Sequence, residues 1–213
     1  MNIVLFGPPG AGKGTQAHII VNKYHYFQLS TGDLLRSEIK KKTSLGNKIA
    51  KTIDQGEFAN DEIVNLLLTK EIKNPKNRNK IIFDGYPRNI SQANKLQQIL
   101  NEDNQKLGLV IFLNISKEII KKRIIGRIVC DKCNLILNEF FHKEEINNHK
   151  CGKNFLKKRK DDNQETIITR YDTYIEKTKP VLDFYSTQEN FYEVDASLKI
   201  EEITSKIDQI IGV

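Results

Sequence analysis

A glycine-rich segment near the start of the chain, directly after a short apolar run, constrains the fold more than any other feature. Residues 3–6 read IVLF, and residues 7–15 follow them as GPPGAGKGT. The run is typical of a strand buried on both faces. The i, i+3, i+4, i+7 spacing of a helix comes next, at Ala17, Ile20, Val21 and Tyr24. This strand-turn-helix context predicts a phosphate-binding loop, with a plain Gly-Pro turn as the alternative.

Three positions in this loop bear on its chemistry. Lys13 is expected to reach the β- and γ-phosphates of a nucleoside triphosphate, and Thr15 to approach Mg²⁺. Many such loops have Ser or Thr directly after the lysine, whereas Gly14 stands there in this chain.

Further short apolar runs alternate with helical patterns along the chain. Residues 81–83, 109–113 and 191–194 indicate buried strands. Asp61 and Glu62 are expected to open a helix. Its apolar stripe is predicted to be Ile63, Leu66 and Leu67, and a closing helix is marked by Ile200, Ile203, Ile207 and Ile210. The alternation predicts an α/β fold, in which right-handed β-α-β units form a parallel sheet flanked by helices on both faces.

Two stretches interrupt this alternation. Residues 30–59 have a mainly helical, polar pattern, and residues 126–163 contain all three cysteines. Neither has the composition of a linker, and we expect both to be insertions into one core. The core then comprises residues 1–29, 60–125 and 164–213.

Composition limits the classes of protein that the chain can belong to. No apolar run reaches 18 residues, so we expect no membrane span and no membrane partner. The N-terminal apolar run is too short for a signal peptide, and the cysteine count is odd, so we expect a cytoplasmic protein. The net charge of +7 is compatible with nucleic acid or with a phosphorylated substrate.

Motifs beyond the loop give the sequence a family resemblance. The GPPGAGKGT form, with glycine after the lysine, resembles the adenylate kinase family. Residues 30–36 (STGDLLR) look like the start of that family's AMP-binding segment, and residues 84–88 (DGYPR), followed by Gln92, look like its DG[FY]PR signature. Residues 123–127 resemble the entry of the family's lid, and residues 159–162 with Arg170 resemble its exit. These matches cover essentially the whole chain, in family order.

The resemblance implies a P-loop kinase core with a helical AMP-binding (NMP) insertion at 30–59 and a lid insertion at 126–163. It implies a usually monomeric enzyme that transfers the terminal phosphoryl group of Mg·ATP to AMP. The implied ATP contacts are Gly10, Ala11, Gly12, Lys13, Gly14, Thr15, Arg123, Arg127, Ile136, Leu137 and Leu198. The implied AMP contacts are Thr31, Arg36, Glu57, Phe58, Ala59, Gly85, Tyr86, Pro87, Arg88, Gln92, Arg159 and Arg170.

Physical chemistry supports these roles. Phosphoryl transfer needs positioning and positive charge, and guanidinium groups match phosphate oxygens bidentately. The catalytic set is expected to be Lys13, Arg88, Arg127, Arg159, Arg170 and Asp84. Asp84 follows a buried apolar strand, where a role near Mg²⁺ would account for its carboxylate. Asp33, Asp161 and Asp162 are weaker candidates, and Asp162 could instead cap the next helix.

The cysteines suggest a metal site in the lid. Cys130 and Cys133 form a C-x2-C pair, and Cys151 follows. They resemble the structural zinc site of some adenylate kinases, whose fourth position falls on Asn154 here. Asparagine is a poor zinc ligand, so His149, His142 or a metal-free lid are alternatives.

Two other functions share features of this sequence. A zinc-ribbon nucleic-acid-binding protein with an ATPase core would use the basic charge, but no aromatic residues interleave with the basic ones to stack bases. UMP/CMP kinases share the loop and the DG[FY]PR signature but tend to have a shorter lid. We therefore expect nucleotide substrates, AMP as acceptor, and no nucleic-acid partner.

Overall fold

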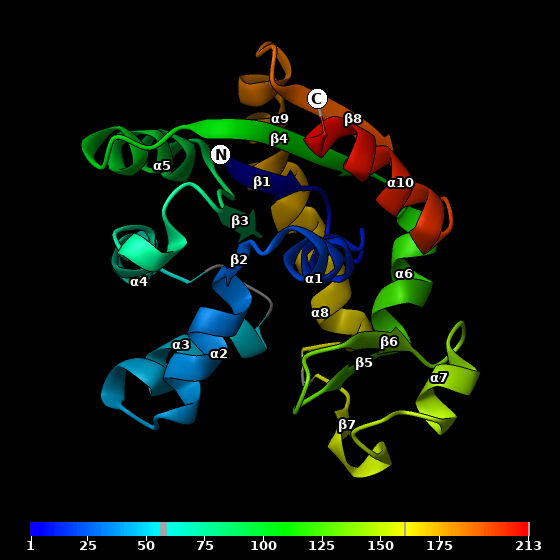
Figure 1. Cartoon of the computed structure of the whole chain (residues 1–213). Helices are drawn as coiled ribbons and strands as arrows, with labels where there is room; N and C mark the ends of the chain where they lie inside the picture. The colour runs from blue at the N-terminus through cyan, green and yellow to red at the C-terminus, as the bar shows by residue number, and fades with distance from the viewer. Residues whose placement is uncertain (56–58, 160, 213) are drawn as a thin grey trace.

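The structure is a computed structural model that describes residues 1–55, 59–159 and 161–212. At its centre lies a parallel five-stranded sheet with the order β2-β3-β1-β4-β8 (Figure 1). Its strands are β1 (Asn2–Phe6), β2 (Phe27–Ser30), β3 (Ile81–Asp84), β4 (Leu107–Asn114) and β8 (Phe191–Asp195). The α/β fold expected from the sequence is confirmed, and β2 is a strand that the sequence pattern did not predict.

Both faces of this sheet are covered by helices. Along β1, Val4 and Phe6 belong to one apolar cluster, and Ile3 and Leu5 belong to another, as the alternation of a strand requires. The first cluster includes side chains of α4 (Asp61–Ile72), α5 (Ile90–Glu102) and α9 (Lys179–Ser186). The second includes side chains of α1 (Lys13–Tyr24), α6 (Lys117–Ile125), α8 (Gln164–Thr173) and α10 (Ile200–Ile211). A short 3-10 helix, η1 (Pro75–Asn77), precedes β3.

Helix α4 begins at Asp61 as predicted, but its buried stripe differs from the expected one. Val64, Leu68 and Ile72 are the buried residues, whereas the side chain of Leu66 is 71% exposed. Apolar residues occur on more than one face of this helix, so spacing alone did not decide which face packs. The predicted stripe of Ile63, Leu66 and Leu67 is therefore wrong at its centre.

The two interrupting stretches form compact units of different kinds. The first contains the helices α2 (Thr31–Lys40) and α3 (Ser44–Asp54). The second contains an antiparallel sheet of order β6-β5-β7 that the sequence pattern did not predict. Its elements are β5 (Arg127–Cys130), β6 (Ile136–Asn138), α7 (Lys143–Asn147), η2 (Lys153–Phe155) and β7 (Leu156–Lys157). Both units lie below the central sheet in the view of Figure 1, one on each side.

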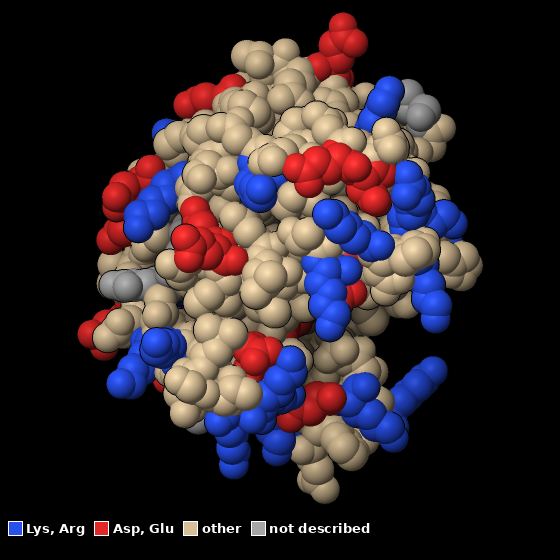
Figure 2. Space-filling view, turned by 90° about the vertical axis from the view of Figure 1, so that its left-hand side faces the viewer, with Lys and Arg blue, Asp and Glu red and all other residues tan. Residues whose placement is uncertain are grey.

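The surface of the α2–α3 unit is strongly basic. Figure 2 shows the face that carries α2 to α5, and blue basic side chains gather at its lower end. Exposed lysines of this unit are Lys40, Lys41, Lys42, Lys48 and Lys51. Among the helices of the described ranges, none is long and apolar enough to cross a membrane.

Candidate active site

The glycine-rich loop lies at the carboxyl end of β1, the edge where open parallel sheets bind ligands. Gly10 and Gly12 have φ angles of 81° and 96°, in the left-handed region that favours glycine. Gly12 is the N-cap of α1, and no side chain caps that helix. The first-turn N–H groups of α1 and its positive dipole end are therefore directed at the loop, where they suit phosphate oxygens.

Gly14 makes room for two neighbours of the loop. A Cβ atom at this position would lie 2.8 Å from Cδ1 of Ile136 and 3.5 Å from Oδ2 of Asp84. Glycine after the lysine therefore allows both a residue of the second inserted unit and the carboxylate after β3 to approach α1. Asp84 also accepts a hydrogen bond of 3.0 Å from Nε2 of Gln28 on β2.

Lys13 is folded back onto its own loop. Its Nζ donates hydrogen bonds of 2.8 Å and 2.9 Å to the carbonyl oxygens of Gly7 and Pro8. Burial lowers the pKa of Lys13 to about 8; Asp84 opposes this shift, and nearby arginines such as Arg88 reinforce it. A phosphate group beside Lys13 would favour its charged form.

A second group of residues lies where α2 meets the loop after β3. Arg88 donates from Nε to the Gly85 carbonyl oxygen at 2.7 Å and from Nη2 to Oγ1 of Thr31 at 3.4 Å. Arg36 forms an ion pair with Asp33 on α2. Burial, with the charge of Arg170, lowers the pKa of Arg88 to about 10, so it stays charged at neutral pH.

Two arginines meet at a buried aspartate where the second unit joins the core. Arg127 donates from Nε to Oδ2 of Asp162 at 2.7 Å, and Arg170 lies 3.3 Å from Oδ1 of the same carboxylate. The Asp162 side chain is only 1% exposed. Burial alone would lower the pKa of Arg127, but the hydrogen bond to Asp162 raises it. The alternative that Asp162 caps α8 is wrong, because the N-cap is Asn163.

Arg159 completes this group. Within the described ranges its guanidinium makes no hydrogen bond or ion pair, and burial beside Arg127 and Arg36 lowers its pKa to about 10. The charges of Asp33 and Asp162 only partly oppose this shift, and a buried guanidinium that is bonded to neither carboxylate is suited to receive a phosphate group. Asp161 pairs with Arg170 at 3.3 Å; burial alone would raise the pKa of Asp161, but Arg170 and Arg127 lower it.

One cavity of about 800 Å³ brings these groups together. It is lined by Lys13 and by six arginines: Arg36, Arg88, Arg123, Arg127, Arg159 and Arg170. The other predicted residues that line it are Gly10, Ala11, Gly12, Gly14, Thr15, Ala59, Asp84, Gly85, Tyr86, Pro87, Ile136, Leu137 and Leu198. Such a concentration of cations, beside the N-terminus of α1 that no side chain caps, suits a ligand with several phosphates.

Two of the predicted AMP contacts, Thr31 and Gln92, do not line this cavity. Thr31 is buried behind Gly85, to whose carbonyl oxygen it donates at 2.9 Å. The Gln92 amide is buried as well, and both of its ends are engaged within the protein. Glu57 and Phe58 lie outside the described residues.

The structure also adds cavity residues that sequence reasoning missed, namely Gln28, Phe141, His142, Tyr174, Thr178 and Lys199. Gln28 lies on the unpredicted strand β2, and Phe141 and His142 follow the unpredicted strand β6. Tyr174 and Thr178 come from η3 (Tyr174–Thr178), a π-helical turn whose only cue in the sequence is the proline at position 180. These positions became visible only through the tertiary fold.

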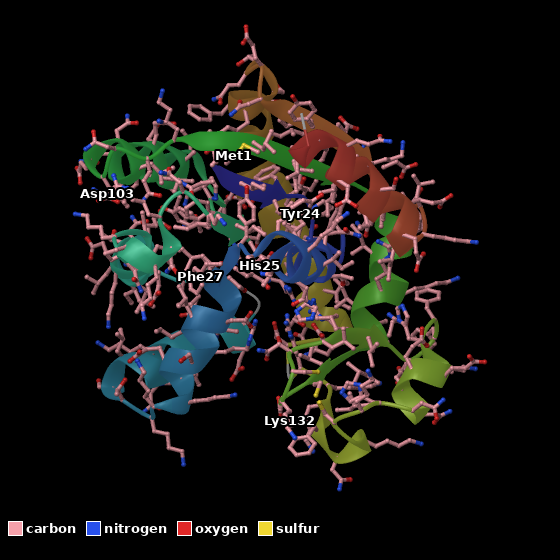
Figure 3. All side chains as sticks on the ribbon, in the orientation of Figure 1. Met1, Tyr24, His25, Phe27, Asp103 and Lys132 are labelled. Carbon is pink, nitrogen blue, oxygen red and sulfur yellow. The ribbon has the colours of Figure 1, made fainter. Side chains whose placement is uncertain are left out.

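The three cysteines converge at the far end of the second unit. The ligand atoms of Cys130, Cys133, Cys151 and His149 lie within 4.8 Å of one another. Cys130 and Cys133 flank a turn in which the Asn134 N–H donates to the Cys130 carbonyl oxygen at 2.9 Å. Figure 3 labels Lys132, which lies between the paired cysteines at the lower end of this unit.

The composition and electrostatics of this cluster fit a tetrahedral zinc ion. Sγ of Cys133 is 3.7 Å from Nε2 of His149. Burial alone would raise the pKa of Cys130, but backbone N–H groups at Cys133 and Lys132 and the His149 side chain lower it to about 6. A thiol that ionises this readily is suited to bind metal.

The geometry favours His149 as the fourth ligand over the other positions considered. Asn154 is exposed on η2, and its side-chain oxygen is a poor zinc ligand. His142 is engaged elsewhere, since its Nδ1 accepts a hydrogen bond of 3.0 Å from the Asn138 N–H. The fourth ligand is therefore expected at His149, before Cys151, and not at Asn154, where the family spacing would place it.

Comparison with known proteins identifies the relatives of this chain. The family model described as adenylate kinase matches residues 5–190. An adenylate kinase of Pelagibacter ubique is 60% identical over the full length of both chains. An adenylate kinase of Zymomonas mobilis is 38% identical over 99% of this chain and 96% of the relative. One of Novosphingobium aromaticivorans is 39% identical, with 100% and 99% covered.

Proposed function

The chain belongs to the adenylate kinase family, and from this premise we propose which residues carry out its reaction. That reaction is the reversible, Mg²⁺-dependent transfer of the terminal phosphoryl group of ATP to AMP, giving two ADP. The observation that carries the residue assignment is the convergence of Lys13 and six arginines on one cavity beside a glycine-rich loop.

The donor nucleotide binds on the loop. N–H groups of residues 10–15 surround its phosphates, and Lys13 leaves the loop carbonyls to contact the β- and γ-phosphates. Ile136, Leu137 and Leu198 provide apolar cavity surface for the adenine ring. Arg123, which lies 3.5 Å from the Ala11 carbonyl oxygen, lies against the same ring.

The acceptor binds beside α2. Arg36 and Arg88 hold the AMP phosphate through bidentate hydrogen bonds, and Gly85, Tyr86, Pro87 and Ala59 line its part of the cavity. The glycine at position 85 matters here, because a Cβ atom would lie 3.1 Å from Nη2 of Arg88 and displace its guanidinium.

Transfer proceeds in line, without a covalent intermediate. An AMP phosphate oxygen is already ionised, so no general base is required. Arg127, Arg159 and Arg170 stabilise the charge on the moving phosphoryl group, and they are charged before substrate arrives. Mg²⁺ supplies further positive charge beside the β- and γ-phosphates when it enters with ATP, and Asp84 and Thr15 offer the oxygen atoms that would hold it.

Water is the competing acceptor of the phosphoryl group, and the two insertions exclude it. We propose that residues 30–59 act as the NMP domain and residues 126–163 as the LID, with the remaining ranges as the core. Each unit supplies arginines to the cavity while lying outside the central sheet, which suits closure over bound substrate.

Lys13→Ala tests the donor site. We expect kcat to fall by about 10²–10³, the loss typical of removing one group that stabilises transition-state charge. Lys23→Ala, on the exposed part of the same helix, is the matched control and should keep the parent rate.

A coupled assay with AMP, CMP, UMP and GMP then tests the acceptor. Near-normal turnover of Lys13→Ala would contradict the site, and a preference for UMP or CMP would contradict the acceptor.

We also propose that Cys130, Cys133, His149 and Cys151 hold a structural zinc ion. A matched pair of variants separates the two candidates for the fourth ligand. His149→Ala should lower the zinc-to-protein ratio measured by mass spectrometry, and Asn154→Ala should leave one zinc per chain. If Asn154→Ala lost zinc and His149→Ala retained it, Asn154 would be the fourth ligand, as the family spacing implies.

A monomer and a cytoplasmic location complete the proposal. All groups assigned to the reaction come from one chain, so no partner subunit is needed. Cys130, Cys133 and Cys151 form no disulfide bond in the described residues, the state maintained in a reducing compartment. Sedimentation velocity on the purified protein would test the monomer, and fractionation of source cells would test the location.

A further inference from the structure

The backbone of Arg88 is held from both sides by side chains of other elements. Its N–H donates to Oε1 of Gln92 at 2.7 Å, and its carbonyl oxygen accepts a hydrogen bond of 2.8 Å from Oγ1 of Thr178. With the guanidinium also bonded to Gly85 at 2.7 Å, both the main chain and the side chain of Arg88 are fixed.

The Gln92 side of this arrangement is supported in turn. Nε2 of Gln92 donates to one carboxylate oxygen of Asp61 at 2.6 Å, and Nδ2 of Asn89 donates to the other at 2.9 Å. The reverse orientation of the Gln92 amide would put its oxygen against the carboxylate and its NH₂ against an N–H donor. The start of α4 therefore orients the oxygen that holds the Arg88 N–H.

The Thr178 side depends on a local departure from α-helical geometry. In η3 the Lys179 N–H donates to the carbonyl oxygen of Tyr174, five residues back, and a proline follows at position 180. A π-helical turn contains one residue more than the corresponding α-helical turn, so it changes the direction of the side chains that follow. Thr178 is 5% exposed and lies at the cavity, with its hydroxyl on Arg88.

We propose that Thr178 is a positioning residue for the acceptor site, acting through the backbone of Arg88. The inference rests on the proposed role of Arg88 in holding the AMP phosphate. Without the hydroxyl, the Arg88 carbonyl oxygen loses its donor and the loop after β3 can shift. The guanidinium then meets the phosphate in poorer geometry, while the ATP side of the cavity keeps its contacts.

Thr178→Val tests this proposal, because valine keeps the shape of threonine and removes the hydroxyl. We expect the KM for AMP to rise about tenfold, the effect of one lost buried hydrogen bond, with the KM for ATP unchanged. Thr178→Ser, which retains the hydroxyl, should restore the parent KM. Thr173→Val is the matched control, since among the described residues the Thr173 hydroxyl donates only within its own helix, to the Thr169 carbonyl oxygen.

The outcomes separate this inference from the proposed function. If Arg88→Ala raises the KM for AMP but Thr178→Val does not, the inference fails and the role of Arg88 stands. If Arg88→Ala leaves that KM unchanged, the proposed acceptor site fails. Equal rises in the two KM values, or loss of cooperative thermal unfolding in both Thr178→Val and Thr178→Ala, would make Thr178 a stability residue and overturn the proposal.

Discussion

The two inserted units reach the same cavity but are stabilised in different ways. In the α2–α3 unit, Leu35 and Ile49 are buried in the same apolar cluster as Val4 and Phe83 of the central sheet. In the described part of the β5–β7 unit, the buried apolar residues are Cys130 and Leu137, and neither belongs to a core cluster. The first unit is thus an extension of the core, whereas the second depends on local contacts.

Local contacts in the second unit include buried polar contacts and the cluster of three cysteines and His149. Asn138 is buried and donates from Nδ2 to the Arg123 carbonyl oxygen at 3.0 Å, which joins β6 to the end of α6. Arg127 and Asp162 pair at the base of the unit, and the cysteine cluster closes its far end. A unit held at its base and at its tip, with a small apolar interior, can move as a body without disturbing the core.

The largest expected contrast between the units is catalytic. Arg127→Ala should lower kcat by about 10²–10³, because a donor to the transferring phosphoryl group is lost. Arg36→Ala should mainly raise the KM for AMP, because Arg36 contacts the acceptor phosphate in ground state and transition state alike. Steady-state kinetics with each nucleotide varied would measure both. Equal effects on kcat would contradict the proposed difference between a catalytic role for the β5–β7 unit and a binding role for the α2–α3 unit.

A second contrast concerns global stability. Ile49→Ala should lower the free energy of unfolding by about 2–4 kcal/mol, since it leaves a cavity in a cluster shared with the sheet. Leu137→Ala, equally apolar and 5% exposed, should change the main urea transition much less, because its surroundings can open locally. Urea unfolding followed by circular dichroism would measure both, and similar losses would show that the β5–β7 unit is as closely coupled to the core as the α2–α3 unit.

The smallest expected contrast is in pH dependence. The pKa of Lys13, lowered to about 8, predicts that kcat/KM for ATP falls roughly fivefold between pH 8 and pH 9, because free enzyme loses the charged lysine. On the acceptor side, Arg88 and Arg159 stay charged in this range, so kcat/KM for AMP at saturating ATP should change less. Lys13→Arg is the control, and its profile should be flat.

The free energy of unfolding should rise with pH over the range in which kcat/KM for ATP falls. Because the folded pKa of Lys13 lies below the unfolded value of 10.5, the unfolded chain binds more protons between pH 8 and pH 10.5. The contribution of Lys13 to the stability of the substrate-free protein therefore rises with pH through this window. Parent and Lys13→Arg melting temperatures across the window would reveal this contribution, and parallel curves would contradict it.

The sequence predicted the buried strands because they are continuous apolar runs. It predicted the phosphate loop because spacing and context agree there. It missed β2, where only Leu29 is fully buried, and it missed the sheet of the second unit, whose strands are two to four residues long. In both cases the strands are stabilised by pairing with neighbouring strands. A single sequence does not show which segments pair.

The site residues also divide into those that the sequence predicted and those that it missed. Residues within recognisable motifs, such as Lys13 and Arg88, could be assigned from spacing. His149 and Thr178 could not, because a turn before Cys151 and a π-helical register decide where these side chains lie. Gln92 shows a related limit, since its neighbours in the fold occupy both ends of its amide.

The hydrogen bonds from Lys13 to the Gly7 and Pro8 carbonyl oxygens have a consequence for how the loop responds to nucleotide. Association at this lysine is an exchange of partners, in which phosphate oxygens displace carbonyl oxygens. The net free energy gained at the lysine is therefore the difference between a hydrogen bond to a charged phosphate oxygen and one to a neutral carbonyl oxygen. A weakly charged ligand gains little binding free energy from that exchange. The resting loop therefore favours polyphosphates over simple anions.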